Sequence, residues 1–343
     1  MAAVQANAPA LRMGGLRLLM VAAAAAALLW AVAAGRVRGG LAAAGLVCLT
    51  AADLWVVDRQ FYTFSPRASV LFRDDEVTEY LKRQPMPFRV LNDPGVYPQS
   101  TLMAYRIPSV WGYHGNELRY YQELGGKDQG WSTLQSPSLI DLLGVRYLIL
   151  QQEQPIPGFR KVLGPVPSTF GGTAVLFERD TVPAYARVVA AAAKVPDAQV
   201  APTVADPRFP GSQVVLFADT ATVHPAALAQ PLPVSAVQAS VQEWRPGEMR
   251  IALAGQDPAE SYLVVSENWY PDWHAEVDGK PGQVVRADHS LIGVVLPAGA
   301  REVHLHFASA AYARGKLVSL VALAAALALL GVPLLSRRRV AGA

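Results

Sequence analysis

Three long apolar segments dominate the hydrophobic pattern of this 343-residue chain. Two lie close together near the N-terminus, in residues 18–34 and 39–57, and the third spans residues 317–335. A helix needs about 20 mostly apolar residues to cross the hydrocarbon core of a bilayer, and each segment is near that length. The pattern therefore predicts about three transmembrane helices, two within residues 18–57 and one at 317–335.

Strand-type alternation is clearest just before the third apolar segment. In Arg301–Phe307, positions 303, 305 and 307 are apolar and the positions between them are polar, as in a strand with one buried face. Asp278-Gly279 is a strong signal for a two-residue hairpin turn. Two further alternating strands are predicted before this stretch, in Val234–Gln242 and Met249–Leu253. We expect residues 234–312 to form an antiparallel β-sandwich or jelly-roll-like module.

Helix and strand signals alternate in residues 58–192, which we expect to form an α/β region. Arg73–Arg83 places acidic residues first and basic residues last, as the helix dipole favours, and Asn116–Leu124 begins with a good N-cap residue. The other predicted elements are a helix at Ser138–Leu143 and strands at Phe88–Leu91, Val145–Leu150 and Thr173–Glu178. Residues 193–233 are rich in Pro, Ala and Asp and are expected to be linker-like, with one strand at Val214–Phe217.

The arginines beside the apolar segments predict how the chain crosses the membrane. By the positive-inside rule, Arg337–Arg339 place the basic tail, residues 336–343, in the cytoplasm. Residues 58–316 then lie outside the cytoplasmic membrane, and the turn that carries Arg36 and Arg38 is cytoplasmic. The N-terminal segment, residues 1–17, falls outside, which its two arginines fit less well. We therefore expect a C-terminal portion of a longer or split polytopic protein. A signal peptide in residues 18–34 is the alternative.

Composition narrows the class of protein. Charged residues make up 17% of the chain, against about 25% in typical soluble domains. The net charge is only +3, and the basic residues cluster at membrane edges, so no nucleic-acid partner is predicted. Cys48 is the single cysteine, which excludes an intrachain disulfide. The lipid bilayer is the first partner that the sequence predicts.

The stretch Ser261–Phe307, SYLVVSENWYPDWHAEVDGKPGQVVRADHSLIGVVLPAGAREVHLHF, is followed by an apolar helix and resembles the C-terminal end of the bacterial YfhO-like membrane protein family. Four further runs resemble that family in the same order: Trp111–Leu124 (WGYHGNELRYYQEL), Leu142–Leu150 (LLGVRYLIL), Val182–Val189 (VPAYARVV) and Asp206–Phe217 (DPRFPGSQVVLF). The third run departs from the family pattern, because Tyr185 and Ala186 break its usual Pro-Arg pair. Together the runs span the region between the second and third apolar segments.

The resemblance implies a function as well as a fold. The YfhO-like family is polytopic and GT-C-like, and it is linked to sugar transfer from polyprenyl-phosphate donors. It therefore implies a multi-pass protein of the cytoplasmic (inner) membrane, with transfer of a sugar to a cell-envelope polymer or lipid as the parent activity. The polyprenyl-phosphate sugar donor is implied by the family alone, since no cofactor motif is found in the sequence.

Catalytic residues do not carry over from the resemblance. Glycosyl transfer needs a carboxylate base to activate the acceptor hydroxyl, and GT-C-like proteins hold their acidic residues on the first outer loop. Here the segment before the first apolar helix, MAAVQANAPALRMGG, contains neither Asp nor Glu. We therefore expect this chain alone to be non-catalytic.

Aromatic side chains are the candidate glycan contacts, because aromatic faces stack on sugar rings. One cluster lies beside a turn and contains Trp269, Tyr270, Trp273 and His274. A second contains Trp111, Tyr113 and His114, followed by Tyr120 and Tyr121. Core packing is the alternative interpretation of both clusters.

Polar candidates are weaker. Asp53 and Asp58 are membrane-edge acids; an ionisable group late in an apolar helix is often functional, and a helix-end acid that reaches the interface is the alternative. His304 and His306 share a strand face, but two ligands without a third do not predict a metal site. The adjacent residues Asp288-His289-Ser290 point apart on a strand and cannot form a catalytic triad.

The leading hypothesis is a membrane-anchored, non-catalytic C-terminal portion of a GT-C-type glycosyltransferase, of α+β fold class. It would bind or position a cell-envelope glycan, or pair with a polytopic catalytic partner or an N-terminal half. The alternative is a non-enzymatic envelope scaffold that binds partner proteins. An exposed apolar patch on the β module, in place of an aromatic groove, would distinguish the scaffold.

Overall fold

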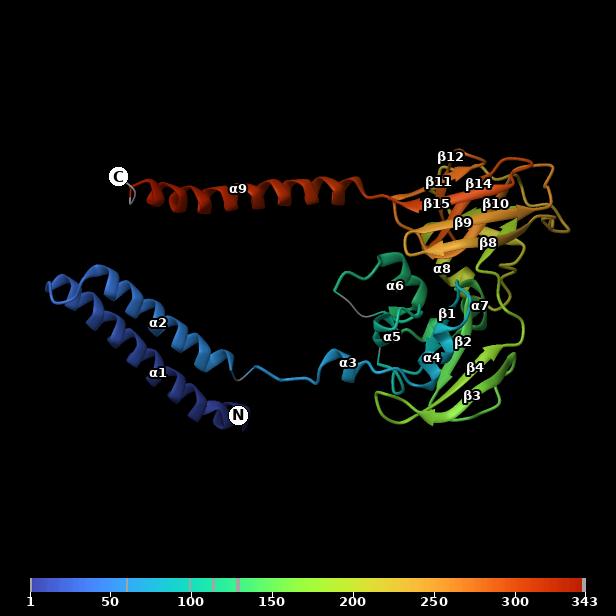
Figure 1. Ribbon diagram of the computed structural model, residues 1–343. Coiled ribbons are helices and arrows are strands. Elements are labelled where there is room, and N and C mark those ends of the chain that lie inside the picture. The colour runs from blue at the N-terminus through green and yellow to red at the C-terminus, as the bar shows by residue number, and fades with distance from the viewer. Residues whose placement is uncertain (1, 60, 99, 113–114, 128–129, 341–343) are drawn as a thin grey trace. The chain divides into compact units, whose positions relative to one another are not determined.

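The computed structural model describes residues 2–59, 61–98, 100–112, 115–127 and 130–340 (Figure 1). The chain divides into two compact units, Met1–Leu71 and Phe72–Ala343. The α+β fold class is confirmed: three long apolar helices accompany several sheets that are mainly antiparallel.

The first unit is a helical hairpin. Helices α1 (Ala2–Ala33) and α2 (Gly39–Asp58) pack against each other, and a short helix α3 (Ala68–Leu71) follows. The apolar stretches Leu11–Ala33 and Gly39–Asp58 have mean hydropathies of 2.1 and 1.9 and are long enough to cross a membrane. Helix α1 begins well before residue 18, although the sequence ahead of that position contains Pro9, Gly14 and Gly15 besides its five alanines.

A four-stranded sheet organises the start of the second unit. Its strand order is β1 (Arg89–Asn92), β2 (Val145–Leu150), β4 (Thr173–Arg179) and β3 (Phe159–Pro167), with β1 parallel to β2 and the other pairs antiparallel. Helix α4 (Glu76–Lys82) and the short α5 (Thr101–Ala104) accompany this sheet. Asp75 caps α4 by accepting a hydrogen bond from the Thr78 backbone N–H, which explains why the helix begins later than the predicted Arg73.

Two antiparallel sheets form the predicted β-sandwich. One has the order β13 (Val284–Ala287), β14 (Leu291–Leu296), β10 (Ser261–Asn268) and β5 (Ala186–Val189). The other has the order β12 (Lys280–Gly282), β11 (Trp273–Val277), β15 (Glu302–Phe307), β9 (Glu248–Ala254) and β8 (Gln238–Arg245). Leu263 and Val265 of the first sheet pack with Val303 and Leu305 of the second in one buried core. The edge strand β5 comes from sequence far ahead of residue 234.

The predicted hairpin turn connects β11 to β12. Asp278 and Gly279 both have positive φ, 49° and 75°, as a two-residue turn of this kind requires. The Asp278 carboxylate also accepts hydrogen bonds from the backbone N–H groups of Arg301 and Glu302. The turn therefore ties the hairpin to the start of β15.

A third layer covers the other face of the β10 sheet. It contains α6 (Arg119–Gly125), the 3₁₀ helix η2 (Ser132–Gln135), α7 (Pro137–Leu142), α8 (Asp197–Ala205) and the parallel pair β6 (Ala191–Val195) and β7 (Val214–Ala218). Tyr262 and Val264 of β10 pack into this layer, so β10 is buried on both faces. The segment 193–233, expected to be linker-like, holds α8 and the fully buried β7. Pro196 is the N-cap of α8, Pro202 lies inside that helix, and the other prolines of the segment lie in loops and turns.

The last helix, α9 (Ala310–Val340), directly follows β15. Its stretch Ala310–Leu329 has a mean hydropathy of 1.5 and is the third candidate membrane span among the described residues. The helix starts earlier than the apolar segment at 317–335, because Ala310–Lys316 contains no residue that breaks a helix interior apart from Gly315.

Candidate functional site: two cavities that flank helix α6

Helix α6 is short, and its C-terminal end determines how Trp131 packs against it. The helix was predicted to begin after Asn116, but it begins after Leu118. Leu118 is the residue with extended φ and ψ, and its carbonyl accepts the first helical hydrogen bond. It ends at Gly125 and the left-handed Gly126, with φ +68°. A Cβ atom on Gly125 would lie 2.7 Å from the Trp131 ring. The glycine therefore lets Trp131 pack directly against the helix end.

One face of α6 lines the cavity that we call the aromatic cavity. Its volume is about 140 Å³, and Trp111, Tyr121 and Trp131 form its apolar walls. The indole Nε1 of Trp111 donates to the Asn92 carbonyl at 2.6 Å, and the Tyr121 hydroxyl donates to the Val110 carbonyl at 2.6 Å. These bonds hold the polar ends of two rings in place, so the rings act as fixed walls.

Polar groups complete the lining of the aromatic cavity. Arg89, Ser109, Glu117 and Asn268 lie at its border. Arg89 is almost fully buried; its Nη1 donates to the Leu143 carbonyl at 3.1 Å and its Nη2 to Glu267 at 2.9 Å. Burial raises the pKa of Tyr121 to about 12 against the opposing effect of Arg89, so this hydroxyl stays protonated at neutral pH. The cavity thus combines rigid aromatic walls with a fixed cation and an amide.

The opposite face of α6 borders a larger cavity of about 730 Å³, here called the charged cavity. Arg119, Gln122 and Glu123 of α6 line the charged cavity, together with the C-cap residue Gly126. Tyr121 and the N-cap residue Leu118 line the aromatic cavity instead, as the helical repeat requires. The charged cavity is lined by both signs of charge: Arg119, Glu123, Lys127, Asp197 and His289.

His289 is the buried titratable group of the charged cavity. Its side chain is 4% exposed, and its Nε2 lies 2.9 Å from Glu123 Oε2. Burial lowers the pKa of His289 in spite of its hydrogen bond to the Glu123 carboxylate, so the imidazole is neutral at pH 7. A neutral ring must donate its Nε2–H to the carboxylate, which leaves a lone pair on Nδ1. Nδ1 is buried and has no hydrogen-bond partner among the described residues.

Tyr120 and Trp269 bring the two predicted aromatic clusters together. Their ring centroids lie 6.1 Å apart, and Tyr120 also contacts His289 edge-on at 5.5 Å. The Arg286 guanidinium stacks 3.8 Å from the Tyr120 centroid and pairs with Asp197. Tyr120 therefore links α6 to the β-sandwich through a stacked cation and two rings.

The four residues of the first predicted cluster do not share one surface. Trp273 is 8% exposed and packs in the core of the sandwich, where its ring meets Phe307 at 5.6 Å. His274, the next residue on β11, faces outward and stacks on His306 at 5.4 Å. Tyr270 is 45% exposed and lies 6.0 Å from Phe307. Only Trp269 points toward α6.

The remaining candidates are placed as follows. Trp111 lines the aromatic cavity, whereas Tyr113 and His114 lie outside the described residues. Asp53 pairs with Arg17 at 2.8 Å across the α1–α2 hairpin, and Asp58 is the exposed last residue of α2. No metal-binding group of His, Cys, Asp or Glu occurs among the residues that the structure describes.

The triplet Asp288-His289-Ser290 was predicted to lie on a strand, but it forms the turn between β13 and β14, where Asp288 and His289 have positive φ of 43° and 71°. The three side chains still do not form a triad, because each bonds to a different partner. Asp288 bonds to Arg187, His289 to Glu123, and Ser290 to Asn268. Sequence reasoning nevertheless did not single out His289, Arg89 or Trp131 for the site. Their partners lie as far as 166 and 178 residues away in sequence, so no local motif marks them.

Comparisons with known proteins give limited similarity. No protein-family model and no curated protein matches the chain. Among solved structures, the chain is similar to two cryo-EM structures of the arabinofuranosyltransferase AftD from mycobacteria. One, a mutant form, is 30% identical over 31% of this chain with a TM-score of 0.24, and the other is 29% identical over 30% with the same score. The similarity covers 8% of either AftD chain, and such a score does not define a common fold.

Proposed function

We propose that the chain binds a sugar ring of a cell-envelope glycan in the aromatic cavity and holds it next to a membrane. The observation that carries the proposal is the set of three aromatic walls, Trp111, Tyr121 and Trp131, bordered by Arg89 and Asn268. A sugar ring has apolar C–H faces and a rim of hydroxyls. Aromatic walls match the faces, and a guanidinium and an amide match the hydroxyls.

The size of the aromatic cavity selects a single ring. Its volume of about 140 Å³ is below the range of about 300–1,000 Å³ that is usual for drug-sized ligands. An extended oligosaccharide would therefore place one residue in the cavity and continue outside it. The polar ends of Trp111 and Tyr121 are already bonded to the backbone, so the binding surface needs little reordering.

The membrane part of the proposal rests on three apolar helices and the charges beside them. We place Phe72–Lys316 outside the cytoplasmic membrane and the Arg337–Arg339 tail inside, in accord with the positive-inside rule. Tyr270 and Phe307 are the exposed large apolar residues of the strands and loops in 238–307, and Phe307 lies three residues before α9. Aromatic residues at this position are typical of a membrane interface.

The class that we infer is the membrane-anchored portion of a GT-C-type glycosyltransferase, with a role in binding or positioning the glycan. The ordered resemblance of five sequence runs to the YfhO-like family supports this class. In this proposal, the carboxylates for transfer come from a polytopic partner or from further membrane helices. The aromatic cavity supplies acceptor or product binding.

Binding of pure oligosaccharides to the full chain in lipid nanodiscs tests the proposal. Maltotetraose, mannotetraose and arabinotetraose are titrated separately by calorimetry and by saturation-transfer NMR. At least one should bind saturably, and Trp131→Ala should weaken that binding about tenfold, because it removes one wall. Trp244→Ala is the matched control, since Trp244 packs against the sandwich core and lines neither cavity. Failure of all three sugars to bind, or an unchanged affinity in Trp131→Ala, overturns the proposal.

A further inference from the structure

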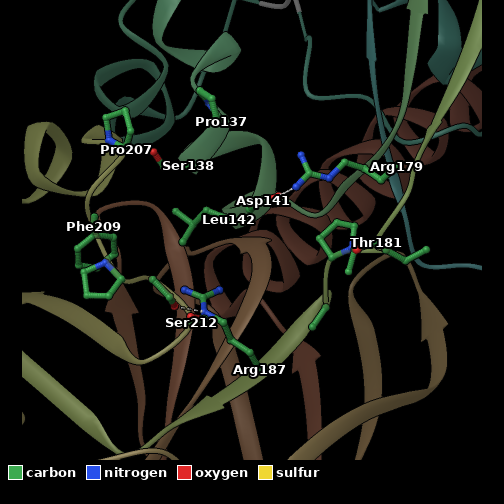
Figure 2. A pocket seen from close by; sticks show the side chains of 15 residues that line it. Pro137, Ser138, Asp141, Leu142, Arg179, Thr181, Arg187, Pro207, Phe209 and Ser212 are labelled. Carbon is green, nitrogen blue, oxygen red and sulfur yellow. Dashed lines mark hydrogen bonds and ion pairs between the residues drawn. The ribbon is translucent and has the colours of Figure 1, made fainter. Parts of the chain in front are cut away.

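A third cavity, of about 500 Å³, is lined in part by residues of α7 (Figure 2). It is bounded by α7, by the crossing segment from β4 to β5 and by the loop after α8. We call it the arginine cleft. The lining residues used in the argument below are Arg179, Arg187, Asp141, Leu142, Phe209 and Ser212. Neither the aromatic cavity nor the charged cavity shares a lining residue with it.

Arg187 is a fixed cation at the bottom of the arginine cleft. Its Nε donates to the Gly211 carbonyl at 2.8 Å, and its Nη2 donates to Asp288 at 2.5 Å. Asp288 is fully buried and also accepts from the Leu216 backbone N–H at 2.9 Å. This carboxylate therefore lies behind Arg187 and cannot turn into the cleft. Figure 2 shows the guanidinium of Arg187 reaching up beside Ser212 toward Leu142.

Arg179 approaches from the opposite wall and is held differently. Its guanidinium pairs with Asp141, a side chain that is 55% exposed. Its Nε is buried and has no hydrogen-bond partner among the described residues. A buried guanidinium N–H without a partner is costly, and a bound water, ion or ligand is the usual explanation.

Apolar groups form the rest of the wall. Figure 2 shows Leu142 between Arg179 and Arg187, and Phe209 on the side of the cleft away from Arg179; Pro137, Pro183, Pro207 and Pro210 are further lining residues. Prolines and a phenyl ring give a surface that changes little on binding. A ligand in the cleft would meet a cation on each of two walls, with rigid apolar groups beside them.

From this geometry we propose that the arginine cleft is a binding site for an organic oxyanion, with its phosphate or carboxylate group on Arg179 and Arg187 and an apolar body against Phe209. Guanidinium groups suit such oxyanions because their N–H donors match two oxygens at once. The two aspartates have different roles. Buried Asp288 orients Arg187, whereas exposed Asp141 is the counterion that the ligand replaces on Arg179.

Phenyl phosphate is the probe for the oxyanion with an apolar body, and it is titrated into the full chain in nanodiscs by ³¹P NMR. Inorganic phosphate and phenol are titrated in parallel as the anion alone and the apolar body alone. Phenyl phosphate should bind saturably and about tenfold more tightly than inorganic phosphate, and phenol should show no saturable binding. Empty nanodiscs give the background from lipid.

Three variants then assign the site. Arg179→Gln should weaken phenyl phosphate binding about tenfold or more, because it removes a charged donor. Asp141→Asn should strengthen binding several-fold, because the competing counterion is lost. Phe209→Ala should reduce the affinity for phenyl phosphate to that for inorganic phosphate. Arg208→Gln is the matched control, since Arg208 is 90% exposed and pairs with Asp206 outside the cleft lining.

The variants distinguish a ligand site from a merely structural ion pair. Loss in Arg179→Gln together with a gain in Asp141→Asn supports the site, because a merely structural ion pair would give the same sign in both variants. Equal binding in Arg179→Gln and Arg208→Gln overturns it. Equal affinity for inorganic phosphate and phenyl phosphate overturns the apolar body. None of these results depends on sugar binding in the aromatic cavity, which is measured with neutral oligosaccharides.

Discussion

Arg89 and Glu267 form an ion pair with 2.9 Å between Nη2 and Oε2, although they are 178 residues apart in sequence. Glu267 also accepts a hydrogen bond from the Tyr185 hydroxyl at 2.7 Å. The pair joins β1 of the first sheet to β10 of the sandwich, and Arg89 at the same time borders the aromatic cavity. One guanidinium therefore connects the two sheets and lines the proposed sugar site.

Glu267→Gln should lower the free energy of unfolding by about 2–3 kcal/mol, because it leaves the buried Arg89 without its counterion. Urea denaturation of the detergent-solubilised chain, followed by tryptophan fluorescence, measures the change. Glu243→Gln removes an exposed partner of Arg250 and should change stability by less than about 0.5 kcal/mol. Equal effects of the two variants would contradict the role of the buried pair.

Stability should fall as the pH is lowered through about 6.5, because burial holds the pKa of His289 below its ordinary value. The sign follows from proton linkage. Between the lowered pKa of the folded state and about 6.5, the unfolded chain binds the proton that the folded chain excludes. His289→Gln should make the urea midpoint less dependent on pH between 7 and 5. A decline as steep in His289→Gln as in the native sequence would assign the effect to other groups.

Gly125→Ala should weaken sugar binding and destabilise the fold by about 1–3 kcal/mol. The added Cβ would lie 2.7 Å from the Trp131 ring, so the indole must leave its wall position. Gly115→Ala is the matched control, since a Cβ there meets nothing within 4 Å. Calorimetric titration with the oligosaccharide that binds the native chain checks the effect. Unchanged binding in Gly125→Ala would show that the position of Trp131 is not needed.

Cysteine labelling tests the proposed side of the membrane. Cys48 is the single cysteine, so Cys48→Ser gives a cysteine-free background. In that background, Ser240→Cys on the exposed edge strand β8 should react with a membrane-impermeant maleimide in intact cells, and Ala343→Cys should react only after permeabilisation. Labelling of Ala343→Cys but not Ser240→Cys in intact cells would reverse the topology.

The sequence predicts those elements whose signals are local. Val145–Leu150 is β2, the Asp278-Gly279 turn is in place, and the apolar segments are helices. The position of β5 at the edge of the sandwich sheet could not be predicted. Its pairing with β10 joins Ala186–Val189 to residues more than 70 positions later, and the strand itself is only four residues long. Helix α8 was hidden by its proline, because a single Pro inside a short helix lowers its local signal.

For the candidate site, local sequence signals identify some of the lining residues and miss others. Trp111 is predicted from its aromatic cluster and does line the aromatic cavity. Trp131 sits in a left-handed backbone conformation after a glycine-rich stretch, which gives no hint that its ring packs on α6. Trp273 shows the opposite case: strand alternation alone places its ring in the core and the next residue, His274, outside.

The pair of Arg17 and Asp53 changes how the first two helices can enter a bilayer. A single arginine or aspartate at the centre of a membrane helix costs about 2.5–3.5 kcal/mol on insertion scales. Here the two charges neutralise each other at 2.8 Å between α1 and α2, so the hairpin carries no net charge at that level. The two helices are therefore expected to partition into lipid as one unit.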